Sequence, residues 1–443
     1  MKAVLRIFLL FTGLACILNC KPKEHISQNE LATKWAEMAI YITKNTPANS
    51  PTYASRCFGY IGLTMYESVV FSSSEFQSIA NQLNGLKLNT TQESPSDLVT
   101  ELAFNAATAR ILKNIYNQTS DQNKLKIDSL EQHFEHYFKE NQAETKVKKS
   151  VAYGVSIANQ IFEWSKTDGG HRGYLKNFDK KLEFEQKPGG WQPPLYAQSF
   201  SHFPLHPYWG QNRTFVSTNS QLEKPKFIPY STDKNSDYYK QFLAVYEKER
   251  SLTQAEKEAA IWWGDDPDET PTPPGHSFYL ATYVLKKTNA DLVHSAQTYA
   301  MLGMSLADAF RNCWKWKYEF FTERPNTYIP ANIDSTWTSF WPDPPFPAFP
   351  SGHAIQAKAC ATVLSGIFGE KFEITDSLHV GRRRDQVRDV DFKVRTFQSF
   401  HQISKETADS RFYGGIHTPQ DNLAGQIKGK EIAENIAKLK WKR

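Results

Sequence analysis

The tetrapeptide Pro350-Ser351-Gly352-His353 stands directly before an alanine-rich segment that ends near Phe368. The segment predicts a helix, and the first turn of a helix carries unpaired backbone N–H groups and partial positive charge. Gly352 permits close backbone approach, the Ser351 hydroxyl adds a hydrogen-bond donor, and His353 adds a group that titrates near neutral pH. The pattern predicts an anion site with a proton-transfer group, although Ser-Gly before a helix is also an ordinary N-cap.

Three basic side chains could compensate the charge of such an anion. Lys317 and Arg324 are seven residues apart, or about two helical turns, so we expect them on one face of a helix that Pro325 ends. Arg411 follows later in the chain. Guanidinium and ammonium groups bind a tetrahedral oxyanion such as phosphate or vanadate through charge-assisted hydrogen bonds. Each cation alone also fits a solvated helix face.

A second histidine precedes the last predicted helix. His417 stands directly before Thr418-Pro419, which is typical of a helix start, and the helical pattern continues to about Leu439. Asp421 is placed to accept hydrogen bonds at this end and to return toward His417. A carboxylate in that position is a candidate for orienting the His417 imidazole. The same aspartate also fits simple helix capping.

Taken together, these residues form three motifs in a fixed order, and the motifs resemble a known signature. They are Lys-x6-Arg-Pro at 317 to 325, Pro-Ser-Gly-His at 350 to 353, and Ser-Arg-x5-His-x3-Asp at 410 to 421. The signature is similar to that of the superfamily of vanadium-dependent haloperoxidases and type 2 phosphatidic acid phosphatases. The resemblance implies an oxyanion, vanadate or phosphate, bound by Lys317, Arg324, Ser351, Gly352, Arg411 and His417.

The resemblance also implies separate roles for the two histidines. His417 is expected to bind the vanadium or phosphorus directly, which makes it the metal ligand of a vanadate enzyme. His353 is expected to act as the acid–base partner, and Lys317 to polarise the reacting oxygen. An upstream acidic residue is expected to hydrogen-bond His353. Asp266 is the candidate for that residue, with Asp265 as the alternative.

Features outside the motifs resemble the haloperoxidase branch. Trp314 and Phe346 match the aromatic wall positions beside vanadate in chloroperoxidase-type enzymes, and the segment from Pro51 to Val70 resembles the N-terminal bundle of that branch. This implies oxidation of halide, iodide or bromide, by hydrogen peroxide on vanadate, with phosphate able to occupy the site in its absence. A phosphatase that forms a phosphohistidine on His417 is the alternative, and an inactive anion-binding protein is a third hypothesis.

The chain predicts an all-α fold of two packed helical bundles, joined by long irregular connections rich in aromatic residues and proline. Apolar residues at three- and four-residue spacing predict four or five helices within residues 27–168. Residues 169–236 lack periodicity and predict an ordered irregular segment that wraps the helices. Residues 237–443 predict the catalytic bundle, with a break from Gly264 to about His276 and a long helix from Leu292 to Glu323. We expect residues 21–443 to form one domain.

Residues 1–20 predict export. A basic start is followed by the apolar run Ile7 to Ile17, which is short for a membrane span, and Cys20 follows as in a bacterial lipobox. We expect a lipid-anchored protein of the bacterial periplasm or cell envelope, with simple cleavage and release as the alternative. The net charge of +5 over 443 residues does not favour a nucleic-acid partner. The sequence leaves both a monomer and a homodimer open.

Overall fold

The computed structural model describes residues 25–89, 94–194, 201–267 and 269–443. Helices dominate these residues, and the strands among them are a single short antiparallel pair, so the predicted all-α class is confirmed. The predicted signal peptide and Cys20 lie outside the described ranges. Among the residues within them, no helix is both long and apolar enough to cross a lipid bilayer.

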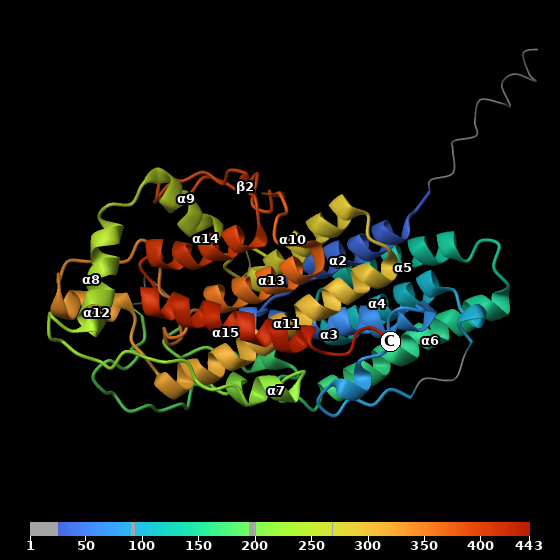
Figure 1. Ribbon diagram of the computed structural model, residues 1–443, viewed down its shortest axis with the longest axis horizontal. Coiled ribbons are helices and arrows are strands. Elements are labelled where there is room, and N and C mark those ends of the chain that lie inside the picture. Colours follow the sequence, from blue (N-terminus) through green and yellow to red (C-terminus); the bar gives the residue numbers. More distant parts are fainter. Residues whose placement is uncertain (1–24, 90–93, 195–200, 268) are drawn as a thin grey trace, which may run out of the picture.

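Five helices occupy the N-terminal part of the chain and lie at one end of the molecule (Figure 1). Serine caps three of them, where the side chains of Ser27, Ser50 and Ser120 accept hydrogen bonds from backbone N–H groups of the first turn. The five are α2 (Gln28–Lys44), α3 (Pro51–Glu67), α4 (Thr100–Ile115), α5 (Asp121–Phe138) and α6 (Glu144–Ser165).

The remaining helices build the other end of the molecule, and α11 runs through the middle and packs against both α3 and α13 (Figure 1). They are α8 (Asp237–Glu249), α9 (Gln254–Trp262), α10 (Thr272–Thr288), α11 (Leu292–Phe320), α12 (Pro325–Asn332), α13 (Gly352–Phe368), α14 (Phe400–Tyr413) and α15 (Pro419–Ala437). Strands β1 (Ile374–Asp376) and β2 (Arg395–Phe397) pair between α13 and α14, with Thr375 opposite Thr396.

Two expectations about helices were wrong. A break was predicted from Gly264 to about His276, but α10 already begins within it, at Thr272. Pro273 and Pro274 are compatible with the helix because they lie in its first turn, where a helix needs no N–H donor. The predicted helix from Leu292 to Glu323 ends earlier, at Phe320, because Phe321 takes a left-handed conformation. Arg324 therefore caps α12 and does not share a helix face with Lys317.

The irregular segment after α6 packs against the helices. It contains the short helices η4 (Gly173–Leu175), η5 (Trp209–Gln211) and α7 (Ser217–Ser220). Its described part buries Trp191 and Trp209. The carbonyl of Leu205 accepts hydrogen bonds from Trp314 Nε1 at 3.0 Å and from the Tyr318 hydroxyl at 2.6 Å. The segment is thereby fixed to the half of α11 that carries Lys317.

Helices α13 and α15 approach each other closely because Gly429 of α15 faces the backbone of α13. A Cβ atom added at Gly429 would lie 2.1 Å from the carbonyl oxygen of Ile355. We expect Gly429→Ala to lower the free energy of unfolding by about 1–3 kcal/mol, since the strain exceeds the gain of alanine in a helix, which is at most about 1 kcal/mol. Urea unfolding followed by circular dichroism measures this change.

Gly366 on α13 provides the matched control, because a Cβ atom there would meet no atom within 4 Å. We expect Gly366→Ala to leave stability unchanged or to raise it slightly. Equal effects of the two substitutions would contradict the importance of the close α13–α15 contact.

Candidate functional site

The N-termini of α13 and α15 meet at the centre of the second bundle. Ser351 is the N-cap of α13, its hydroxyl accepts a hydrogen bond from the Ala354 N–H, and its own N–H donates to the Asp421 carbonyl at 3.0 Å. His417 lies directly before the Thr418 cap of α15. Both histidine motifs therefore stand at helix starts, as expected, and a backbone hydrogen bond joins them.

A cavity of about 600 Å³ opens in front of these two helix ends. Gly352, His353, Arg411 and His417 line one part of it. Aromatic rings line another part, among them Trp314, Trp341 and Phe346. The rings of Trp314 and Phe346 lie 4.9 Å apart between centroids. The structure thus brings the predicted histidines and the predicted aromatic wall to one cavity.

The imidazole of His417 is oriented by a carboxylate. Its Nδ1 lies 3.0 Å from Asp421 Oδ2, and the same oxygen accepts the Thr418 N–H at 3.1 Å. Burial and the neighbouring charges of Arg324, Lys317 and Arg411 place the pKa of His417 well below its ordinary value. The ring is therefore neutral, and Nε2 remains for a ligand, since a neutral imidazole is the form that binds a metal centre.

We call Lys317, Arg324 and Arg411 the cation cluster. All three side chains are buried, and none forms an ion pair with a carboxylate anywhere in the described ranges. Lys317 Nζ donates to the carbonyls of Pro347 at 2.8 Å and Ala348 at 2.6 Å. Arg324 Nη1 donates to the Ile416 carbonyl at 2.8 Å. Buried charges without a paired counterion are unfavourable, so this cluster is suited to binding an anion.

The members of the cation cluster differ in position. Arg411 lines the cavity, and its Nε donates to Ser410 Oγ at 3.0 Å. Lys317 and Arg324 flank the ring of Phe346, with Lys317 Nζ and Arg324 Cζ each 5.2 Å from its centroid. Burial and the charge of Arg324 lower the pKa of Lys317 to about 7. A bound anion would restore the ordinary ionisation of this lysine.

His353 is half-buried, and its ring hydrogen-bonds the backbone of Gly264. Its Nε2 has no hydrogen-bond partner among the described residues. Burial and the charge of Arg411 place the pKa of His353 well below its ordinary value. The hydrogen bond expected from Asp266 or Asp265 is not formed in the described part of the chain. Asp265 bonds two other histidines, and Asp266 faces the cavity.

Those two histidines, His276 and His379, were not among the site residues that the sequence pattern predicted. His276 lies in α10, which was not predicted, and His379 lies in the loop after β1, more than a hundred residues away. Neither has a neighbour in sequence that marks it as part of a site. Asp343, which lines the cavity, was also missed. Only the packing of distant segments reveals these residues.

Comparisons with known proteins find relatives that match the part of the chain carrying these motifs. Residues 297–442, which include every residue of the three motifs, match the family described as the VCPO second helical-bundle domain. A vanadium-dependent bromoperoxidase of Corallina officinalis is 28% identical over 92 residues, which span 20% of this chain and only 15% of that protein.

Solved structures extend the likeness to nearly the whole chain. A bacterial vanadium-dependent iodoperoxidase is similar with a TM-score of 0.76 and 27% identity, over 91% of this chain and 95% of that one. The holo form of a bacterial vanadium-dependent chloroperoxidase, at 14% identity and a TM-score of 0.65 over 90% and 97% of the chains, shares the fold. The family match covers the three motifs and the fold match covers both bundles, so these findings support a vanadium-dependent haloperoxidase, the class that the motifs resemble.

Proposed function

We propose that this protein oxidises halide, iodide or bromide, with hydrogen peroxide on a histidine-bound vanadate. The observation that carries the proposal is the cation cluster: three buried cations without carboxylate partners among the described residues surround the neutral imidazole of His417. A buried site with this excess of positive charge is suited to a tetrahedral oxyanion. The similarity to a bacterial iodoperoxidase supports iodide or bromide as the halide.

The residues present fit vanadate. Lys317, Arg324 and Arg411 would compensate its charge, the Gly352 N–H would donate at the helix N-terminus, and His417 Nε2 would bind the metal. Ser351 caps α13 in this structure, so its hydroxyl can both cap the helix and donate to an oxygen. Bound vanadate supplies a Lewis acid that activates hydrogen peroxide toward halide.

The protein's own groups then manage charge and protons. His353 is neutral, and its Nε2 is free to accept a proton from hydrogen peroxide and to return it to a leaving oxygen. Asp421 holds the proton of His417 at Nδ1, which keeps Nε2 as the binding atom. The aromatic wall excludes water from one side of the cavity, which strengthens the electrostatic interactions inside it.

One comparison of activities tests this proposal against the phosphatase alternative. Purified protein is assayed with and without orthovanadate for oxidation of iodide and bromide by hydrogen peroxide, and in parallel for hydrolysis of a phosphate ester. We expect halide oxidation only after vanadate loading. Ester hydrolysis without halide oxidation by the loaded protein would replace the proposal with a phosphatase function.

Two carboxyl groups make the use of halide depend on pH. Asp266 and Asp343 line the cavity, and burial raises the pKa of each to about 6. Below pH 6 both are neutral, whereas above it they are negative and repel a halide anion. We expect the KM for iodide to be lower at pH 5 than at pH 7 by a factor on the order of five, or ~1 kcal/mol of repulsion. Steady-state kinetics across this range measure the change.

The double variant Asp266→Asn with Asp343→Asn is the control for this pH effect, because it removes the two carboxyl groups that change charge in that range. A KM that varies with pH as steeply in the double variant as in the natural protein would assign the effect to other groups, such as Lys317.

We also propose that the protein is exported to the bacterial envelope and anchored by lipid at Cys20. The basic start, the apolar run and the cysteine at the end of residues 1–20 support this proposal. Mass spectrometry of the membrane fraction tests it. An unmodified N-terminus at another residue would contradict the lipid anchor.

A further inference from the structure

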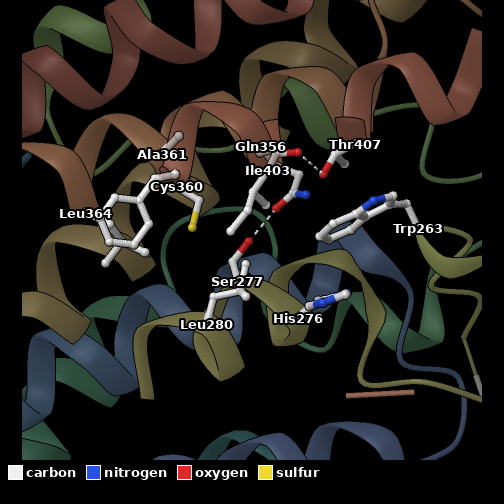
Figure 2. Close-up of a pocket in the computed structure, with 12 residues that line it drawn as sticks. Trp263, His276, Ser277, Leu280, Gln356, Cys360, Ala361, Leu364, Ile403 and Thr407 are labelled. Carbon is white, nitrogen blue, oxygen red and sulfur yellow. Dashed lines mark hydrogen bonds between the residues drawn. The ribbon is translucent and has the colours of Figure 1, made fainter. Parts of the chain in front are cut away.

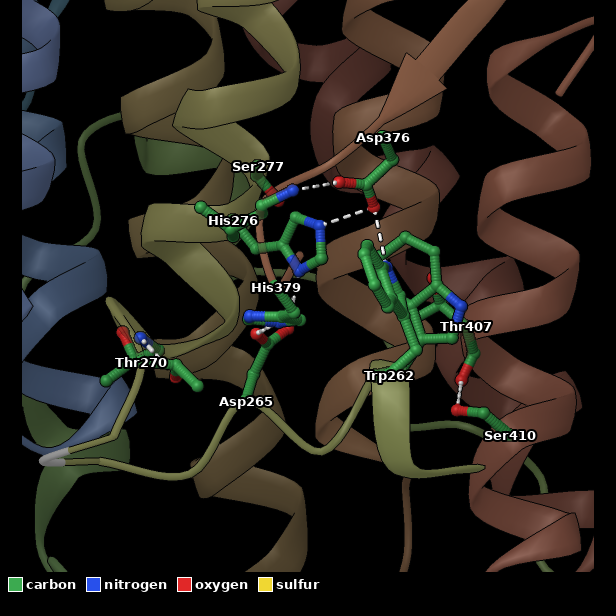
Figure 3. Close-up of polar contacts among 12 residues, drawn as sticks. Trp262, Asp265, Thr270, His276, Ser277, Asp376, His379, Thr407 and Ser410 are labelled. Atoms are coloured by element: carbon green, nitrogen blue, oxygen red, sulfur yellow. Dashed lines mark hydrogen bonds and ion pairs between the residues drawn. The ribbon is translucent and has the colours of Figure 1, made fainter. Parts of the chain in front are cut away.

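Figure 3 shows a buried group of two histidines and two aspartates, of which Asp265 also lines the cavity. His276 on α10 has Nδ1 2.9 Å from Asp265 Oδ2 and Nε2 2.8 Å from Asp376 Oδ2. His379 Nε2 lies 2.9 Å from Asp265 Oδ1. Trp262 Nε1 donates to Asp376 Oδ2 at 2.7 Å. We call Asp265, His276, Asp376 and His379 the carboxylate–imidazole cluster.

His276 is an imidazolium within this cluster. Carboxylate oxygens face both of its nitrogens, and carboxylates only accept hydrogen bonds, so both nitrogens must carry protons. Burial opposes this charge, but Asp265 and Asp376 outweigh burial and raise the pKa of His276 to about 10. The cation in turn stabilises two carboxylates that would otherwise be buried without compensation.

Three of these residues could also be the ligands of a metal ion, because ligand atoms of Asp265, His276 and His379 lie within 4.8 Å of one another. The hydrogen bonds argue against this. Both nitrogens of His276 and both oxygens of Asp265 are already engaged, and Asp376 bonds His276 from the opposite side of the ring. The geometry therefore suits protons better than an ion.

The cluster is connected to His353 through the backbone. Asp265 directly follows Gly264, whose backbone is the hydrogen-bond partner of the His353 ring. Asp265 has a φ of 50°, a left-handed conformation that is uncommon for residues other than glycine. Hydrogen bonds to both of its carboxylate oxygens, from His276 and His379, stabilise this conformation and so fix the direction of the Gly264 carbonyl.

A second contact joins the same turn of α10 to the helix of His353. Ser277, next to His276, donates from its hydroxyl to Gln356 Oε1 at 2.7 Å (Figure 2). Gln356 is three residues after His353 on α13. The pocket between these side chains has a volume of only about 10 Å³, so at most one water molecule fits there. The turn of α10 at His276 is thus linked to His353 in two ways. It is linked to the ring through Asp265 and Gly264, and to helix α13 through Ser277 and Gln356.

We propose that His276 is a positioning residue for His353, acting through Asp265 and the Gly264 carbonyl. This proposal rests on the proposed function, in which His353 transfers protons. His276 does not touch the reacting groups. Its charge keeps the Asp265 carboxylate in place, and the backbone that Asp265 controls orients the His353 ring so that Nε2 faces the cavity.

The first test uses the full chain loaded with vanadate and the variant His276→Gln. We expect kcat for iodide oxidation to fall about 10- to 100-fold, as when an orienting partner of an active imidazole is lost. Vanadate affinity and the KM for iodide should change less than about twofold, because His417 and the cation cluster lie on other segments. A kcat equal to that of the natural protein, or an equal loss of vanadate affinity, would overturn the proposal.

A double-variant comparison separates positioning from general damage. If His276 acts through His353, then His276→Gln should add no further loss to His353→Ala. His206→Gln is the matched control, because His206 is also buried, stacks on Trp209 as His276 stacks on Trp263, and has no carboxylate partner among the residues that the structure describes. Any loss in that variant should multiply with the loss of His353→Ala. Multiplying losses for His276→Gln would overturn the proposal.

Two further measurements do not depend on enzyme activity. They therefore test the positioning role of His276 even if the natural protein does not oxidise halide and the proposed function is wrong. In protein labelled with ¹⁵N-histidine, the His353 ring signals, assigned by their loss in His353→Ala, should shift in His276→Gln and not in His206→Gln. Unchanged His353 signals would overturn the proposal. Elemental analysis provides the second measurement. One divalent metal ion per chain in the natural protein that is lost in His276→Gln would also overturn the proposal.

Discussion

Replacement of His417 by alanine is expected to abolish vanadate retention, with an affinity at least about 100-fold weaker than that of the natural protein. The imidazole is the only group of the proposed site that would bind the metal directly, and Asp421 orients it at 3.0 Å. The cation cluster would still attract an anion, but without a bond to the central atom. Vanadium content after gel filtration, together with equilibrium dialysis, measures the effect.

Asp421→Asn is the graded control for this prediction. Asparagine retains a side-chain oxygen but removes the negative charge that fixes the His417 tautomer, so we expect a loss of affinity of about 10- to 100-fold. Vanadate retention by His417→Ala at the level of the natural protein would show that the cation cluster alone binds the anion. It would also remove His417 from the role of metal ligand.

Replacement of His353 by alanine is expected to spare vanadate binding and to reduce kcat for halide oxidation by about 10²- to 10⁴-fold, which is the usual contribution of an acid–base group. The reason lies in the position of the ring. Its Nε2 has no partner among the described residues, and its other contact is the backbone of Gly264, so it supports no other side chain of the site. Dialysis and steady-state kinetics on the same preparation measure both quantities.

The two histidine variants must behave differently for the assignment of roles to stand. His417→Ala should lose vanadate and activity together, whereas His353→Ala should lose activity alone. Equal vanadate affinity in the two variants would refute the division of roles. Removal of vanadate by a chelator should make the natural protein resemble His417→Ala, and added orthovanadate should restore only the natural protein.

The sequence was sufficient for the features that depend on neighbouring residues. The helix start at Ser351, the start of α15 at Thr418 and the hydrogen bond from His417 to Asp421 each involve residues only a few positions apart, where capping rules apply. The all-α class followed from local periodicity and is confirmed. Local rules failed at α10, where prolines in the first turn resembled a break, and at Phe321, where a left-handed residue separates Arg324 from α11.

Only the tertiary structure decided which buried carboxylates pair with which histidines. The sequence placed Asp265 and Asp266 as alternative partners of His353, and packing instead directs Asp265 to His276 and His379 and leaves Asp266 at the cavity. His276 and Asp376 are 100 residues apart and are brought within 2.8 Å by the contact of α10 with β1. The sequence by itself determined the motifs of the proposed oxyanion site, because helix ends and their caps are formed by adjacent residues. The surroundings of His353 depended on burial and on long-range contacts, which no local spacing encodes.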